Sequence, residues 1–177
     1  MRRAVFLDRD GVITRSNVRG GRPYAPTTLD DFEVLPGVSA ALQKLRQAGY
    51  LNLVVTNQPD ISTGKQSTDV LDAMHAHLLG ELAIDAIRVC AHVDAHGCDC
   101  RKPKPGMLVD LAGEWGVDLA TSWMVGDRWR DIGAGQAAGC RCCFIECGYE
   151  EKHPDPPYIA VGSLVEAAEV ILKNQHA

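Results

Sequence analysis

Short apolar runs and amphipathic segments alternate along this 177-residue sequence, and this alternation restricts the possible folds more than any other feature. Runs such as AVFL (4–7) and LNLVVT (51–56) are typical of buried strands, whereas residues 37–50 carry apolar side chains on one helical face. Strands that alternate with helices indicate a parallel, doubly wound (Rossmann-like) α/β sheet. We predict one domain over residues 1–177.

The same patterns locate the remaining elements. Ser67 is a suitable N-cap for one helix, and Gly116 can end another. The predicted strands are residues 4–7, 51–56, 86–90, 122–127 and 140–146, and the predicted helices are residues 37–50, 67–82, 107–116, 131–139 and 163–173.

Charge and hydropathy exclude several classes of function. The formal net charge of −5 argues against a nucleic-acid-binding protein, because such domains are usually basic. No apolar run approaches the roughly 20 residues of a membrane span, and the start MRRAVFLDRD lacks the apolar region of a signal peptide. We therefore expect a cytoplasmic protein, in which seven cysteines indicate metal binding or packing rather than disulfides. We also expect a monomer.

Polar side chains directly follow three of the predicted strands. In doubly wound sheets, ligands bind beyond the carboxyl ends of the strands, so these side chains are the candidate site. A carboxylate can act as a covalent nucleophile, a second one as general acid and base, and a set of oxygens suits Mg²⁺. A solvated acidic turn is the alternative for the first two when they are taken alone. The candidates are Asp8, Asp10, Thr56, Asn57 and Asp127.

A second group of candidate residues lies in CAHVDAHGCDCRKPKPG (90–106). Three cysteines and one histidine make an S₃N ligand set, which is typical of a closed, structural zinc site. His96 is interpreted as a solvated residue rather than a ligand. The loop would bring a short basic run to a small anion such as a phosphoryl group. The predicted zinc ligands are Cys90, His92, Cys98 and Cys100.

Four motifs, in their order and spacing, resemble those of the haloacid dehalogenase superfamily of phosphatases: DRDGV (8–12), TN (56–57), RKPKPG (101–106) and GDRWRD (126–131). The resemblance implies a Mg²⁺-dependent phosphomonoester hydrolase. The connections after the first two strands are too short for a separate cap domain, so we expect a capless enzyme with an open site.

The resemblance also assigns roles to single residues. It implies that Asp8 forms an aspartyl-phosphate and that Asp10 is the general acid and base, with its backbone carbonyl on the Mg²⁺. Thr56 and Lys102 would hold the phosphoryl group, and Asp127 would complete the Mg²⁺ ligands. Asp131 is expected to support these ligands without binding the metal.

The zinc loop and the continuation KPKPGM (102–107) resemble a narrower group, the heptose bisphosphate phosphatases. This resemblance implies removal of the 7-phosphate of D-glycero-D-manno-heptose 1,7-bisphosphate. Histidinol-phosphate phosphatases share the cysteine and histidine pattern and are the nearest alternative. A small phosphorylated sugar is the expected partner, with Asn57, Arg101, Arg128, Arg19 and Arg22 as the residues that would contact it.

The sequence departs from this group at two places. Pro59 and Asp60 replace the usual small residues after TNQ, and a proline has no N–H to offer a phosphate. The loop 16–26 is long and basic, which suggests selection of one anomer of the sugar, the α form. Arg19, Arg22 and Tyr24 of this loop would meet a second phosphate or be solvated.

A receiver-type phospho-acceptor signalling domain is the alternative from another class, because it uses the same sheet with an Asp, a Thr and a Lys. Asp10 discriminates against it, since an acid/base two residues from the acceptor promotes hydrolysis of the acyl phosphate. Four further cysteines are interpreted mainly as small buried hydrophobes: Cys140, Cys142, Cys143 and Cys147.

Overall fold

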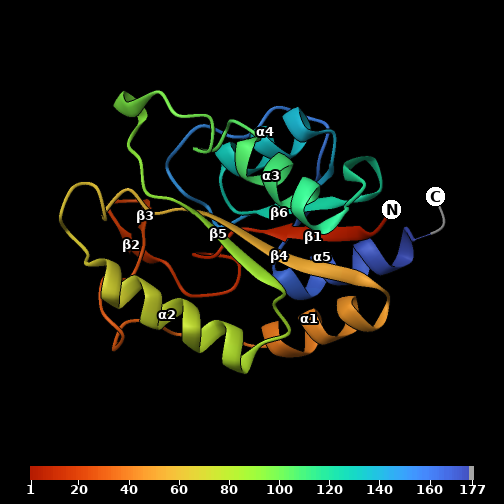
Figure 1. Cartoon of the computed structure of the whole chain (residues 1–177), viewed down its shortest axis with the longest axis horizontal. Coiled ribbons are helices and arrows are strands. Elements are labelled where there is room, and N and C mark those ends of the chain that lie inside the picture. Colours follow the sequence, from red (N-terminus) through yellow and green to blue (C-terminus); the bar gives the residue numbers. More distant parts are fainter. Residues whose placement is uncertain (176–177) are drawn as a thin grey trace.

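A six-stranded parallel sheet with helices on both faces forms the protein in this computed structural model, which describes residues 1–175 (Figure 1). The last two residues of the predicted single domain, 1–177, lie outside the described part. The sheet confirms the predicted α/β class. Its strands are β1 (Arg3–Leu7), β4 (Tyr50–Asn57), β5 (Ala86–Cys90), β6 (Trp123–Gly126), β7 (Arg141–Ile145) and β8 (Ile159–Val161).

In the described part of the chain, five α-helices connect and cover these strands. The ends of the predicted helices and strands differ from the observed ones by at most three residues. Among residues 1–175, none of the helices combines the length and apolar character that crossing a membrane requires. The helices are α1 (Val38–Gln47), α2 (Thr68–Glu81), α3 (Gly106–Trp115), α4 (Trp129–Ala138) and α5 (Leu164–Lys173).

Each face of the sheet has its own apolar core, because successive side chains of a strand point to opposite faces. On β1, Val5 and Leu7 pack with residues of α1 and α5, whereas Ala4 and Phe6 pack with residues of α3 and α4. Three of the four additional cysteines, Cys140, Cys142 and Cys143, are buried in these cores, and Cys147 is exposed. Figure 1 shows the two helical layers on either side of the sheet.

The order of the strands places the candidate site. It is β5-β4-β1-β6-β7-β8, so the chain leaves β1 in one direction to β4 and β5 and returns on its other side to β6. Such a reversal opens a crevice beyond the carboxyl ends of the central strands. The ends of β1, β4 and β6 therefore converge at one edge.

Three short strands were not predicted from the sequence. β2 (Asn17–Arg19) and β3 (Arg22–Tyr24) form a two-stranded hairpin within the basic loop 16–26, and β8 extends the main sheet. Gly20 and Gly21 connect β2 to β3 with φ angles of 54° and 71°, the positive values that a tight hairpin turn requires. Strands of three residues are too short to show a two-residue apolar alternation, so the sequence carried no signal for them.

Candidate functional site

A cleft of about 590 Å³ lies beyond the carboxyl ends of β1 and β4 and brings together most of the predicted site residues. Pro59 and Asp60, the departures after TNQ, also line it. Arg101 and Asp127 are not among the lining residues. The predicted residues that line the cleft are Asp8, Asp10, Thr56, Asn57, Lys102, Asp131, Arg19, Arg22, Tyr24 and Arg128.

Asp8 and Lys102 form a buried ion pair at the base of the cleft. The Lys102 Nζ donates to Asp8 Oδ1 at 2.7 Å and to the Val55 carbonyl at 2.7 Å, and it lies 2.6 Å from Asp131 Oδ1. These three contacts use all three protons of the ammonium group. Lys102 is thus fixed beside the carboxylate that would attack phosphorus.

Burial acts on the ionisation of both groups. It raises the pKa of Asp8 to about 6, and Lys102 opposes this shift by favouring the carboxylate. Burial alone would lower the pKa of Lys102, but Asp131 and Asp8 raise it above its ordinary value. Lys102 therefore stays charged at neutral pH.

The Asp10 carboxylate is held by four hydrogen bonds. Arg9 donates from Nε and Nη2 at 3.0 Å each, Thr14 Oγ1 donates at 3.0 Å, and Gln58 Nε2 donates at 2.8 Å. Arg9 is itself fully buried, and its Nη1 lies 3.1 Å from His75 Nε2. Because a guanidinium only donates, His75 Nε2 is the acceptor. Burial and then Arg9 lower the pKa of His75 to about 4, which agrees with a neutral ring.

The residues near Asp127 suit a divalent cation. Asp8, Asp127 and Asp131 each offer a carboxylate oxygen, and these oxygens lie within 4.8 Å of one another. Asp127 is buried, its Oδ1 has no hydrogen-bond partner among the described residues, and burial followed by Asp8 raises its pKa well above the ordinary value. A side chain on Gly11 would place Cβ 1.9 Å from Asp127 Oδ2, so only glycine leaves room for this carboxylate. Tyr149 donates its hydroxyl to the same Oδ2 at 2.8 Å.

Asp131 differs from the other two carboxylates because both of its oxygens have partners. Oδ1 pairs with Lys102, and Oδ2 accepts from the Arg128 backbone N–H at 3.0 Å. This arrangement suits the supporting role expected for Asp131. The Asp10 side chain is turned to Arg9, which leaves its backbone carbonyl as the group expected to face the cation.

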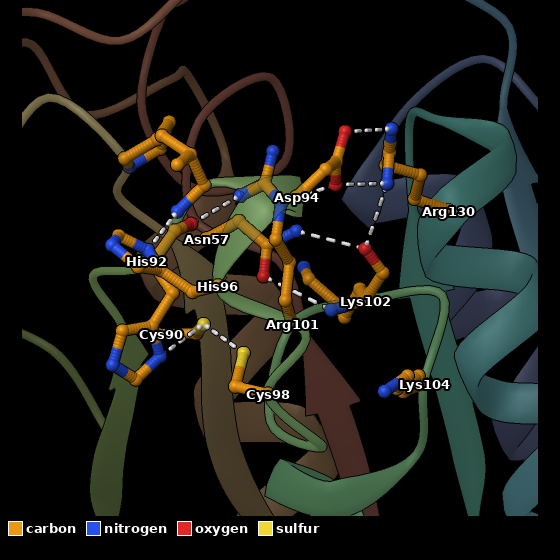
Figure 2. Close-up of polar contacts among 12 residues, drawn as sticks. Asn57, Cys90, His92, Asp94, His96, Cys98, Arg101, Lys102, Lys104 and Arg130 are labelled. Atoms are coloured by element: carbon orange, nitrogen blue, oxygen red, sulfur yellow. Dashed lines mark hydrogen bonds and ion pairs between the residues drawn. The ribbon is translucent and has the colours of Figure 1, made fainter.

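The four predicted zinc ligands lie together at and beyond the end of β5. Figure 2 labels Cys90, His92 and Cys98 among them. The Sγ of Cys100 lies 3.1 Å from the Sγ of Cys90, 3.4 Å from that of Cys98 and 3.3 Å from His92 Nδ1. Tetrahedral zinc with bonds of about 2.0–2.3 Å separates its ligand atoms by roughly 3.5 Å. The donor set and its spacing therefore fit a closed zinc site. His96 is not part of the cluster, and its Nδ1 accepts from the Val93 N–H.

Within the loop 90–106, Lys102 lines the cleft directly, whereas Arg101 does not, and Asp94 reaches the cleft only by pairing with Arg130. Arg101 donates to Asp94 Oδ1 at 2.7 Å and to the His92 carbonyl, away from the lining of the cleft. Arg130 does line the cleft; its guanidinium spans both Asp94 oxygens at 3.0 and 3.1 Å and also donates to the Lys102 carbonyl. Figure 2 shows Asp94 between the two guanidinium groups.

Asn57 also contacts the backbone of Lys102. Its Nδ2 donates to the Lys102 carbonyl at 3.1 Å, and its Oδ1 accepts from the Lys102 N–H at 3.1 Å (Figure 2). The amide thus joins the end of β4 to the lysine that binds Asp8. Its polar atoms hold the site together as well as bordering the cleft.

Arginines and a lysine surround the outer part of the cleft. Arg128 is paired with Glu151 at 2.6 Å. Arg19, Arg22 and Lys65 have no ion-pair partner within residues 1–175. Sequence reasoning missed several polar residues of the site, Arg9 and Asp94 among them. Arg130 lies inside the GDRWRD motif and Gln58 directly follows TN, whereas nothing in the sequence pointed to Lys65 or Tyr149.

Comparisons with known proteins agree with this geometry. A HAD-hydrolase-like family model matches residues 99–167. The D-glycero-β-D-manno-heptose-1,7-bisphosphate 7-phosphatase of Pseudomonas aeruginosa is 40% identical over 152 residues, covering 83% of each chain. The enzyme of the same name from Neisseria meningitidis serogroup A is 36% identical over 185 residues, covering 98% of this chain and 96% of its own.

A solved structure extends the similarity to the whole fold. The D,D-heptose 1,7-bisphosphate phosphatase from B. bronchiseptica, complexed with magnesium and phosphate, matches with a TM-score of 0.83 and 31% identity, over 97% of this chain and 98% of that one. The chain therefore belongs to the heptose bisphosphate phosphatase family of haloacid dehalogenase-like hydrolases, and it is a phosphatase.

Proposed function

We propose that this phosphatase removes the 7-phosphate of D-glycero-β-D-manno-heptose 1,7-bisphosphate. One observation carries the proposal: the cleft that holds Asp8 and Asp10 is also lined by Arg19, Arg22 and Lys65, three cations without ion-pair partners among residues 1–175. A second, non-reacting phosphate is the kind of group that such cations bind. The names of the relatives specify the β anomer, and we propose it in place of the α form expected from the loop.

The proposed reaction has two steps. The Asp8 carboxylate attacks phosphorus and the bond to the sugar oxygen breaks, while Asp10 gives that oxygen a proton. Asp10 then takes a proton from water, whose oxygen attacks phosphorus and releases phosphate and free Asp8. Through both steps the Thr56 hydroxyl donates to a phosphoryl oxygen, and the positive charge of Lys102 beside Asp8 stabilises the negative charge on the phosphoryl group.

We also propose the two metals expected from the sequence. Mg²⁺ would be held by Asp8, Asp127 and the backbone carbonyl of Asp10, and its chemistry there is neutralisation of charge on the phosphoryl group. The unpartnered Oδ1 of Asp127 supports this assignment. Zn²⁺ would be held by the cluster of three cysteines and one histidine and would stabilise its loop.

We further propose that the protein is cytoplasmic and monomeric and that residues 1–177 form a single domain. The seven unpaired cysteines support a reducing compartment, where thiols stay free. Light scattering of the purified protein measures its oligomeric state directly.

The substrate proposal is tested by comparing kcat/KM for both anomers of heptose 1,7-bisphosphate with kcat/KM for histidinol phosphate. We expect the β bisphosphate to be preferred. Histidinol phosphate presents an ammonium and an imidazole, which the cationic outer cleft repels. A preference for histidinol phosphate would reject the heptose substrate and leave the phosphatase chemistry unchanged.

The contribution of the hairpin arginines is tested by replacing Arg19 and Arg22 with alanine. KM for the bisphosphate should rise by the equivalent of roughly 1–3 kcal/mol if both contacts are charge-assisted, while KM for a sugar monophosphate changes little. Arg15→Ala is the matched control, because Arg15 is exposed, pairs with Glu33 and does not line the cleft.

A further inference from the structure

Gln58 contacts two residues of the proposed mechanism: Thr56, which would bind the phosphoryl group, and Asp10, which would protonate the leaving group. It follows β4 directly, and its side chain is fully buried. Its Nε2 lies 2.8 Å from Asp10 Oδ2 and 2.9 Å from Thr56 Oγ1. One amide nitrogen therefore bridges the general acid/base and the hydroxyl that holds phosphate.

The chemistry of its neighbours fixes the orientation of this amide. With the amide reversed, Oε1 would face the Asp10 carboxylate oxygen, and two acceptors would repel each other at hydrogen-bond distance. Nε2 carries two N–H groups, so it can donate one to Asp10 and one to Thr56. Both donors are then used.

This orientation determines what the Thr56 hydroxyl can do. Its oxygen accepts from Gln58, and among residues 1–175 the hydroxyl donates no hydrogen bond. The proton is thus available for a phosphoryl oxygen in the cleft, which Thr56 lines. Without the Gln58 donor, no hydrogen bond among residues 1–175 would fix the rotation of this hydroxyl.

Arg9 and Gln58 hold Asp10 from two different elements. Arg9 is anchored on α2 through His75 and lies with its guanidinium over the Phe32 ring, while Gln58 holds the same carboxylate from the end of β4. The backbone N–H of Gln58 donates to the Cys90 carbonyl at 2.8 Å, which ties this position to β5. Gln58 is consequently a rigid support.

We propose that Gln58 is a positioning residue for phosphoryl transfer, which sets Thr56 as a hydrogen-bond donor to the phosphoryl group and holds Asp10 in register with it. The inference rests on the roles proposed above for Thr56 and Asp10. It adds a residue that touches neither phosphate nor sugar and acts through two groups that do.

The test is the kcat of Gln58→Met, which keeps the length of the side chain and removes both donors. With p-nitrophenyl phosphate as the probe, kcat should fall about 10- to 100-fold, the usual effect of removing a group that orients catalytic residues, while KM changes less than threefold. Gln66→Met is the matched control. Gln66 is also buried and also leaves its Oε1 unpartnered, but it donates to the Pro26 carbonyl rather than to Asp10 or Thr56. Its kcat should stay within about twofold of the parent.

A double-mutant cycle separates positioning from a general loss of structure. If Gln58 acts through Thr56, Gln58→Met should lower kcat by a clearly smaller factor in a Thr56→Val background than in the parent. Asp10→Asn provides the second background, in which the contribution that Gln58 makes to kcat through Asp10 should be smaller. Equal factors in all three backgrounds, or a normal kcat for Gln58→Met, would overturn the inference.

The outcomes also distinguish this inference from the proposed function. Near-normal kcat in both Thr56→Val and Asp10→Asn would overturn the proposed roles and the inference together. Should Gln58→Met unfold at a much lower temperature than Gln66→Met, Gln58→Glu takes its place in the cycle. Its carboxylate keeps the volume, has no N–H to share and repels Asp10, so kcat should fall at least as far.

Discussion

Asp8, Asp127, Asp131 and Lys102 place four ionisable groups in the interior at one end of the sheet. Removing charges from water costs several kcal/mol per ion unless close partners compensate. Lys102 offsets this cost for Asp8 and Asp131, but within residues 1–175 the only hydrogen bond to the Asp127 side chain comes from the Tyr149 hydroxyl. Because the desolvation cost of the Asp127 carboxylate is not offset by a cationic partner, the cluster is better explained by cation binding and catalysis than by a contribution to folding stability.

The two carboxylates of the first motif should respond differently to the same substitution. Asp8→Asn should abolish turnover, because an amide does not attack phosphorus. Asp10→Asn should keep the nucleophile and slow turnover by about 10²-fold or more, since it loses proton transfer to the leaving group and from water. Steady-state kcat for both variants, with circular dichroism to confirm folding, tests this assignment. Near-normal turnover of Asp8→Asn would contradict it.

Tyr149 is expected to matter for Mg²⁺ rather than for stability. Its hydroxyl orients Asp127, and loss of such an orienting partner typically weakens metal binding by about 10- to 100-fold. Titration calorimetry of Tyr149→Phe should show this loss in Mg²⁺ affinity. Tyr158→Phe is the control, because the Tyr158 ring packs on Phe144 and does not contact Asp127. Unchanged Mg²⁺ affinity in Tyr149→Phe would show that Asp127 needs no such partner.

At the scale of elements, helix α2 holds Arg9, next to Asp10 at the end of β1, through His75, whose ring must stay neutral. The interaction of Arg9 with Asp10 depends on the His75 lone pair at Nε2, as a protonated ring would place two cations 3.1 Å apart. The pKa of His75 is lowered from 6.5 to about 4, by burial first and by Arg9 second. At a pH between these two values, His75 is protonated in the unfolded chain but neutral in the folded chain.

The stability of the protein should therefore depend on pH through His75. Because its pKa is lower in the folded state, its contribution is complete above pH 6.5 and is lost as the pH falls towards 4. The free energy of unfolding in urea should fall by roughly 1–3 kcal/mol more for the parent than for His75→Gln over this range. Glutamine offers Arg9 an uncharged acceptor at every pH. Parallel pH profiles for the two proteins would contradict the prediction.

The long elements were predictable from the sequence, and the short ones and the polar supports were not. Buried parallel strands such as β1 and β4 are largely apolar runs, and their ends identified Asp8, Asp10 and Thr56. The hairpin of β2 and β3 lacks such a run. The roles of Arg9 and Gln58 arise only when β1, β4 and α2 meet, because their partners lie up to 66 residues away in the chain.

At the scale of the whole molecule, the two predicted metal sites lie on one edge of the sheet and are joined by a chain of contacts. Asp94 of the zinc loop holds Arg130 beside the cleft, and Arg130 donates to the carbonyl of Lys102 (Figure 2). The proposed zinc site would have four protein ligands and no open position, whereas the carboxylate cluster borders the base of the cleft. Their removal should consequently have different effects.

Removal of Mg²⁺ should abolish activity and leave the fold intact. Brief EDTA treatment followed by gel filtration should give an inactive protein that retains one zinc per chain by atomic absorption, and Mg²⁺ alone should restore turnover.

Loss of a zinc ligand should instead lower the stability of the fold, because zinc binding contributes folding free energy to its loop. Cys98→Ser should lower the zinc content and reduce the thermal midpoint by several degrees or more. In a protein near this size, a loss of about 1 kcal/mol lowers the midpoint by roughly 2–4 °C. Cys147→Ser, which changes an exposed cysteine outside the cluster, should keep both the zinc and the midpoint. If Mg²⁺ proves dispensable and added zinc drives turnover, the roles of the two metals are reversed.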